Sequence, residues 1–168
     1  ERVYERPFEV RVGDERDLPA AREATRPLGR HWNGCRIGFD LGASDVKVAA
    51  VIDGKAVFSE EYGWNPVGQT DPQWHYDQIN GALKQAAAHL PRVDGIGGSS
   101  AGVYVNNRVK VASLFRGVPA GAFESRVKGL FLELQRAWGG IPFEVVNDGE
   151  VTALAGSMSF QANAVLGL

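Results

Sequence analysis

The chain has 168 residues, of which 44% are hydrophobic and 23% are charged, and its formal net charge is −2. This composition is typical of a globular protein and excludes a disordered or collagen-like chain. No apolar run approaches the ~20 residues that cross a bilayer, and the charge gives no basic footprint for nucleic acid. A single cysteine, Cys35, and the lack of a signal segment at the start favour a cytoplasmic location.

Residues 1–34 are predicted to form a charged arm. The first thirty residues hold seven arginines and seven acidic residues, and three prolines interrupt them. A short edge strand is predicted within Val3 to Val12, and a helical stretch within Asp17 to Thr25. A helix-turn-helix needs two helices and a basic face, which this segment lacks, so we expect a solvated arm that packs on the domain edge.

Three strands in a meander are predicted next. Apolar residues alternate at Ile37, Phe39 and Leu41, and again at Val46, Val48 and Ala50. Asp53-Gly54 is a strong two-residue hairpin signal, and it leads into a third strand that begins at Lys55.

Helices and strands then alternate. Asp71 as N-cap and Pro72 at the first helical position predict a helix that ends at Pro91. A fourth strand is predicted over Val93 to Gly98, followed by a small hairpin around Asn106-Asn107. The later elements are a helix over Phe123 to Trp138 that ends at Gly139-Gly140, a fifth strand over Phe143 to Val146, and a third helix after residues 147–149.

This order predicts an α/β domain with a mixed five-stranded sheet and helices on both faces. Order and spacing together indicate a ribonuclease-H-like fold for residues 35–160. Residues 161–168 form an apolar run that is typical of the start of a strand. We therefore expect them to begin a second lobe, and we expect the chain to be a piece of a longer protein.

The first candidate site is the Asp-Leu-Gly-Ala-Ser turn at residues 40–44. Asp40, at the C-terminal end of a strand, can hold Mg²⁺ directly or through water. Gly42 lets the backbone approach a phosphate closely, and successive N–H groups in such a turn bind anions. Ser44 adds a hydroxyl donor, and Lys47 reaches either the phosphates or solvent. Because an Asp-x-Gly turn is common, an ordinary turn stays open as an alternative.

The second candidate site is Asn147-Asp148-Gly149, where a strand leads into a helix. Asp148 or Asn147 could simply be the N-cap of that helix. In the functional interpretation, Asp148 is a general base that accepts a proton from a hydroxyl attacking a phosphoryl group, and Asn147 orients the same substrate. Both candidate sites lie at C-terminal strand ends, where open α/β sheets bind ligands.

Three motifs in order resemble a known group of proteins. Residues 40–47 resemble the first phosphate motif of the sugar kinase, Hsp70 and actin superfamily. Residues 146–149, followed by Ala153-Leu154, are similar to the catalytic Asn-Asp segment of hexokinases and ROK-family sugar kinases. Residues 95–103 are similar to the Gly-rich strand and hairpin of ROK proteins. Over residues 36–168, the chain resembles the N-terminal lobe of a two-lobed, ATP-dependent sugar kinase of the actin-like ATPase superfamily.

The resemblance implies a sugar substrate, with ATP and Mg²⁺ as cofactors. It implies Asp148 as the catalytic base and Asp40 as the metal ligand. The implied phosphate contacts are Asp40, Gly42, Ala43, Ser44 and Lys47, and the implied sugar contacts are Gly98, Ser99, Ser100 and Asn147. The charge and the lack of a long apolar run predict no contact with nucleic acid or a membrane, and a homo-oligomer of the full-length protein stays open. The adenosine site, and the zinc motif of many ROK proteins, would lie beyond Leu168.

Three other functions stay open. The chain could belong to a sugar- or nucleotide-sensing protein of the same superfamily without catalysis, as ROK repressors are. It could belong to an ATPase or acid kinase of that superfamily that uses no sugar. It could also be an interaction domain that keeps the fold and has lost the site, although the presence of both Asp40 and Asp148 argues against this, because neither is needed for packing.

Overall fold

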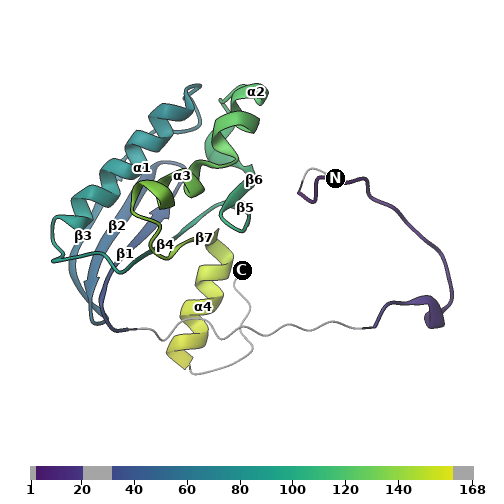
Figure 1. The fold of residues 1–168 in the computed structure, drawn as a ribbon, viewed down its shortest axis with the longest axis horizontal. Helices are drawn as coiled ribbons and strands as arrows, with labels where there is room; N and C mark the ends of the chain where they lie inside the picture. Colours follow the sequence, from purple (N-terminus) through teal and green to yellow (C-terminus); the bar gives the residue numbers. More distant parts are fainter. Residues whose placement is uncertain (1–2, 21–31, 161–168) are drawn as a thin grey trace.

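The computed structural model describes residues 3–20 and 32–160, and it contains a mixed five-stranded sheet with the order β3-β2-β1-β4-β7 (Figure 1). The strands of this sheet are β1 (Cys35–Leu41), β2 (Asp45–Ile52), β3 (Lys55–Gly63), β4 (Gly95–Ser100) and β7 (Phe143–Asn147). Strands β1, β2 and β3 form an antiparallel meander, whereas β4 and β7 continue the sheet parallel to β1. The predicted fold class is therefore confirmed.

Helices cover both faces of the sheet. The longer ones are α1 (Pro72–Ala87), α3 (Leu130–Ala137) and α4 (Asp148–Phe160). Helices α1 and α3 lie on one side of the sheet and α4 on the other (Figure 1). No helix in residues 3–20 or 32–160 is long and apolar enough to cross a membrane.

The main core lies between the sheet and helices α1 and α3. Burial alternates strictly along β1, so Ile37, Phe39 and Leu41 face this core while Asp40 lies on the opposite face. Phe131 of α3 stacks on Phe39 with ring centroids 6.3 Å apart. Strict period-two alternation fixes which face each β1 side chain occupies, because a slip of one residue would turn the apolar set toward α4.

Helix α1 begins as predicted. The side chain of Asp71 accepts a hydrogen bond from Gln73 N (2.9 Å), and Pro72 occupies the first helical position. The helix ends at Ala87, and a short turn leads from there to Pro91. Its buried His75 contacts the carbonyls of Pro66 and Leu114 through Nε2, at 3.0 and 3.2 Å, which is a packing role.

The helix predicted over Phe123 to Trp138 is divided into two parts, a π-helical turn η3 (Phe123–Val127) and α3. A short helical turn, α2 (Ala120–Ala122), precedes them. In the π turn, Lys128 N donates to Phe123 O (3.0 Å), five residues back. This wider turn adds a residue and shifts the helical phase. Phe123 and Val127 before the break, and Phe131 after it, are all buried.

A two-stranded hairpin, β5 (Gly102–Val105) and β6 (Arg108–Ala112), packs beside the main sheet. Its turn residues Asn106 and Asn107 both have positive φ, 50° and 60°, which Asn tolerates well. Asn107 does more than turn the chain. Its side chain is buried, and it donates to Phe143 O (2.6 Å) and accepts from Val145 N (2.9 Å). These two bonds attach the hairpin to β7.

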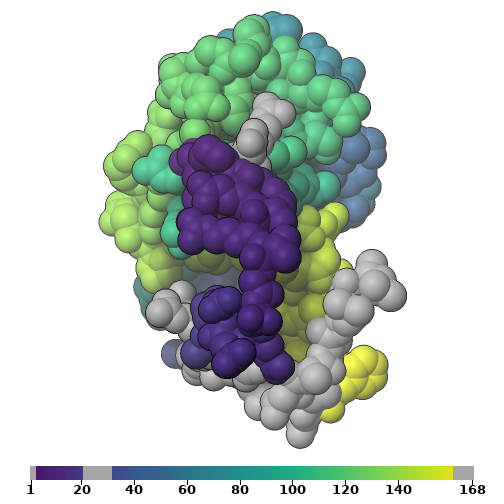
Figure 2. All heavy atoms as spheres, turned by 90° about the vertical axis from the view of Figure 1, so that its right-hand side faces the viewer, coloured from purple at the N-terminus to yellow at the C-terminus, as the bar shows by residue number. Residues whose placement is uncertain are grey.

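The described part of the charged arm, residues 3–20, contains only a short 3₁₀ turn, η1 (Glu15–Asp17). The edge strand expected within Val3 to Val12 is wrong, because residues 3–6 form turns and a bend and residues 7–12 have no regular secondary structure. Of the predicted helical stretch, only Asp17 belongs to the 3₁₀ turn, and residues 21–25 lie outside the described residues. Figure 2 views the molecule from the side on which the arm, in purple, extends away from the domain in Figure 1. Near the start of the arm, Glu5 forms ion pairs with Lys110 and Lys128. The apolar run at 161–168 also lies outside the described residues.

Candidate functional site

Three parallel strands bring both sequence motifs to one edge of the sheet. In the register of β1, β4 and β7, Asp40 is beside Ser99, which is beside Val146. One step further, Leu41 is beside Ser100, which is beside Asn147. Because these are the C-terminal ends of parallel strands, the structure places Asp40 and the start of α4, where Asp148 lies, along the same edge.

Asp40 is half-buried on the α4 side of the sheet and has a defined orientation. The hydroxyl of Ser99 donates to Asp40 Oδ1 at 2.7 Å. No other hydrogen bond or ion pair of the Asp40 carboxylate occurs in the described part of the chain, so Oδ2 stays available. A single oriented carboxylate with a free oxygen fits the way proteins hold Mg²⁺, through one or two carboxylates, water and substrate phosphates. Ser99 therefore orients Asp40.

The loop between β1 and β2 is closed by its own backbone. Gly42 N donates to Asp45 O (2.9 Å), so this N–H is engaged within the turn. A Cβ at position 42 would approach Asp45 O and Oδ1 to 3.1 Å, a tight contact that glycine avoids. From the end of β3, Trp64 Nε1 donates to Gly42 O (2.9 Å) and Trp64 N to Ser44 O (3.0 Å). Ala43 and Ser44 are exposed at the tip.

The two side chains predicted to bind phosphate both contact Asp45. Ser44 Oγ donates to Asp45 Oδ2 (2.8 Å), and Lys47 Nζ lies 2.9 Å from Asp45 Oδ1. Lys47, followed by Ser44, lowers the pKa of the Asp45 carboxyl, and Asp45 in turn raises the pKa of Lys47. A phosphate at this loop would have to displace a carboxylate from Ser44 and Lys47. Sequence analysis predicted no role for Asp45. Its position between Ser44 and Lys47 in the sequence could have indicated that it contacts both side chains.

Asn147 has the role of helix cap that sequence analysis left open. Its Oδ1 accepts from Gly149 N (2.9 Å), and Glu150 Oε2 accepts from Asn147 N (3.2 Å). This is a variant of the capping box, in which the cap side chain accepts from the second helical residue instead of the third. The other end of the amide donates to Gly102 O at 2.8 Å, which connects β7 to β5.

Asp148 is the exposed first residue of α4. The hydrogen bond that its carboxylate makes in the described residues is local, from Gly149 N to Oδ1 (3.0 Å). The carboxylate is therefore anchored by its backbone and accessible to a solute. An unshared carboxylate at a rigid helix start is suited to accept a proton from a bound hydroxyl.

The other predicted sugar contacts face inward. Ser100 is fully buried, and its hydroxyl donates to Leu41 O (3.2 Å). At Gly98, the backbone carbonyl and ring of Phe39 occupy the space that a Cβ would need. Gly98 therefore fits β4 against β1, and Ser100 secures the end of the same pair of strands.

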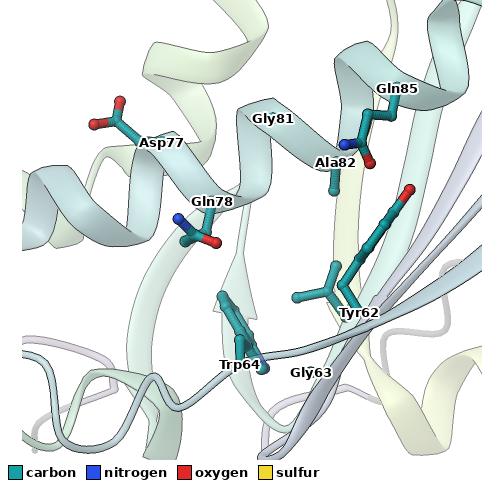
Figure 3. A pocket seen from close by; sticks show the side chains of 9 residues that line it. Tyr62, Gly63, Trp64, Asp77, Gln78, Gly81, Ala82 and Gln85 are labelled. Carbon is teal, nitrogen blue, oxygen red and sulfur yellow. The ribbon is translucent and has the colours of Figure 1, made fainter.

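A separate cleft of about 180 Å³ lies between α1 and the end of β3 (Figure 3). In Figure 3, Gln78 points toward Trp64, and Gln85 points toward Tyr62. The cleft is smaller than the roughly 300–1,000 Å³ of typical ligand pockets. It is also on the α1 side of the sheet, whereas Asp40 is on the opposite face, so we assign the candidate site to the sheet edge. No group of three or more His, Cys, Asp or Glu side chains arranged to hold a metal ion occurs in the described residues.

Comparison with solved structures gives the fold a context. A glucokinase from Parabacteroides distasonis matches 77% of this chain with a TM-score of 0.58 and 17% sequence identity. The ROK hexokinase from Thermus thermophilus matches 74% with a TM-score of 0.54 and 17% identity. A ROK-family transcriptional regulator, a homologue of the E. coli MLC protein, matches 74% with a TM-score of 0.56 and 19% identity.

This chain spans 35%, 37% and 30% of these three proteins, respectively. No protein-family model and no curated protein sequence matches it. At these identities the likeness shows a shared fold, and both sugar kinases and a regulator have that fold.

Proposed function

We propose that this chain is the sugar-side lobe of an ATP-dependent carbohydrate kinase, with Asp148 as the catalytic base and Asp40 as the ligand of Mg²⁺. The observation that carries the proposal is the register of β1, β4 and β7, which aligns Asp40 and the start of α4 along one edge. The folds of a glucokinase and a ROK hexokinase support the same function.

In the proposed reaction, a sugar hydroxyl lies against the exposed carboxylate of Asp148. As the hydroxyl oxygen forms a bond to the γ-phosphorus of ATP, its proton passes to Asp148, and the bond to the ADP oxygen breaks. Such catalysis depends mainly on position and charge. The capping box of Asn147 and Glu150 supports it by holding the start of α4 at the sheet edge.

Asp40 would hold the magnesium ion of the nucleotide through Oδ2, while Ser99 keeps Oδ1 oriented. When bound, the ion would neutralise charge on the phosphates. Lys47 and Ser44 would contact phosphate only after Asp45 releases them. We therefore assign Gly42 and Ala43 to the shape of the loop, and Asp40 to the metal.

The experiment is a panel of monosaccharides with MgATP, tested on the complete gene product. Asp148→Asn should lower kcat by about 10²–10⁴-fold, because the general base is lost while the shape is kept. Asp77→Asn is the matched control, because Asp77 is an exposed carboxylate on α1, away from the sheet edge. Turnover of Asp148→Asn equal to that of the wild type would refute the assignment of the base.

A second candidate function is a sugar sensor that does not transfer phosphate, and the Asp45 contacts favour it. A carboxylate that occupies both Ser44 and Lys47 disfavours a phosphate at this loop, and a regulator shares the fold. Calorimetry with sugars and with MgATP distinguishes the two functions. A sensor binds sugar without turnover, and Asp45→Asn then creates measurable nucleotide affinity. A kinase turns over with Asp45 present.

A further inference from the structure

The cleft between α1 and the end of β3 contains two glycines that neither backbone conformation nor packing requires. Gly81 lies within α1, and Gly63 is the last residue of β3. Neither has a positive φ. Beyond the adjacent residues and the backbone of the helix itself, no described atom lies within 4 Å of the place that a Cβ would take at either glycine. Glycine weakens helices and strands, and here the open space that it leaves belongs to the cleft.

Aromatic rings and side-chain amides line the rest of this cleft. Tyr62 and Trp64 come from the end of β3, and Gln78 and Gln85 come from α1 (Figure 3). Neither glutamine side chain has a hydrogen-bond partner within the described part of the chain. Each amide therefore offers both an acceptor oxygen and an N–H₂ donor to a ligand.

Trp64 has a fixed position, and it connects the cleft to the loop between β1 and β2. Its ring stacks on Trp74 of α1 with ring centroids 5.9 Å apart. Its Nε1 donates to Gly42 O (2.9 Å), and its backbone N–H donates to Ser44 O (3.0 Å). A ligand that contacts Trp64 therefore contacts the residue that holds this loop.

The charge of the cleft favours a neutral ligand. Asp77 is the only charged residue among the described residues that line it. In Figure 3 the Asp77 carboxylate points away from the other lining side chains, and its Oδ1 accepts from Gln73 Nε2 (2.9 Å). A bound anion would face no cation, and a bound cation would face no carboxylate, so neither would recover the cost of leaving water.

A single sugar-like ring matches this lining. The volume of about 180 Å³ suits a ligand smaller than those of typical pockets. The electron-rich face of an aromatic ring attracts the polarised C–H groups of such a ligand, and amides pair with hydroxyls in both donor and acceptor roles. We propose that the cleft is a second binding site, separate from the sheet edge, for a neutral hydroxyl-rich ring of monosaccharide size, and that its occupant acts on the loop at residues 42–45 through Trp64. The site does not depend on the catalytic role proposed for Asp148.

Indole N–H signals in the NMR spectrum of the ¹⁵N-labelled chain test the site, and Trp64→Phe identifies the Trp64 signal. D-glucose, D-mannose or myo-inositol should shift this signal saturably, with a Kd of about 0.1–10 mM because the contact area is small. The Trp32 signal should stay in place, because Trp32 packs near Gly54 at the opposite end of β3. The absence of a saturable shift with all three rings would overturn the site. A saturable shift with choline or inorganic phosphate alone would overturn the ligand class.

Gly81→Leu fills the open space of the cleft and tests where the ring binds. This variant should bind the same ring roughly tenfold more weakly, because its side chain takes up the volume of the ligand. Its urea midpoint should not fall, because leucine favours a helix more than glycine does. Lys84→Leu is the matched control, since it places the same side chain on the exposed surface of α1 outside the cleft, and its affinity should stay within about twofold. Unchanged affinity of Gly81→Leu, or a fall in its midpoint, would contradict the proposal.

Asp148→Asn separates the cleft from the sheet edge. If the Trp64 signal responds equally in the wild type and in Asp148→Asn, the ring binds in the cleft, whatever reaction the sheet edge performs. If Asp148→Asn abolishes the response and Gly81→Leu preserves it, the ring binds at the sheet edge, and the cleft is not a site. The same titration tests the action on the loop: the backbone amide signal of Ser44 should shift together with the Trp64 indole, and an unmoved Ser44 signal would refute this connection.

Discussion

Asn107→Ala tests how the β5–β6 hairpin is held beside the site. The change removes two buried hydrogen bonds, to Phe143 O and from Val145 N, and leaves these backbone groups of β7 without partners. At about 1–2 kcal/mol for each group, the loss is about 2–4 kcal/mol. Alanine at a φ of 60° adds about 1 kcal/mol. The free energy of unfolding should therefore fall by about 3–5 kcal/mol in all.

Asn106→Ala supplies the matched control for the backbone part. Asn106 has a similar φ of 50° and is exposed. Its replacement should therefore cost about 1 kcal/mol through backbone strain alone. Urea unfolding of the 168-residue chain measures both variants, and hydrogen exchange at Val145 N–H reports the local loss. If Asn107→Ala costs no more than Asn106→Ala, within about 0.5 kcal/mol, the side-chain bridge contributes nothing and the reasoning is wrong.

Two further predictions concern stability. Gly98→Ala should lower the free energy of unfolding by about 1–3 kcal/mol or more, because its Cβ would overlap Phe39. Gly97→Ala, whose Cβ would have its nearest contact at 3.9 Å, should change the free energy of unfolding by less than about 1 kcal/mol. Equal urea midpoints for the two variants would contradict this packing. The hydrogen bond from Arg92 is the main cause of the lowered pKa of Asp94. Asp94 therefore stabilises the fold above its ordinary value of 3.8 and loses this contribution as the pH falls through the lower folded-state pKa. Asp94→Asn should therefore lower the urea midpoint more at about pH 6 than at about pH 3, and an equal loss at both would refute the ion-pair assignment.

Much of the sheet could be predicted because its signals are local. Alternation at Ile37, Phe39 and Leu41 places one face of β1 in the core, and Asp53-Gly54 joins β2 to β3 as expected. Asp71 caps α1 with the predicted hydrogen bond. Each of these features depends on residues within a few positions of one another, so a single sequence carries the information.

The features that sequence analysis missed depend on distant contacts. Asn107 was predicted only as a turn residue, because its bonds to Phe143 and Val145 join residues 36 and 38 positions apart. The π turn at η3 contains the buried residues Phe123 and Val127, and local helix propensity does not predict its wider turn.

The second candidate site, Asn147-Asp148-Gly149, is compatible with both interpretations that the sequence left open, a helix cap and a general base. A helix cap needs a short acceptor one residue before the helix, and Asn147 supplies it to Gly149 N. A general base needs a carboxylate that does not serve as the helix cap, and Asp148 is the residue directly after Asn147. Because Asn147 also donates to Gly102 O, the same residue fixes the start of α4 to the β5–β6 hairpin. The cap is therefore the means by which the fold holds Asp148 at the sheet edge, so that the structural role and the proposed catalytic role fall to neighbouring residues.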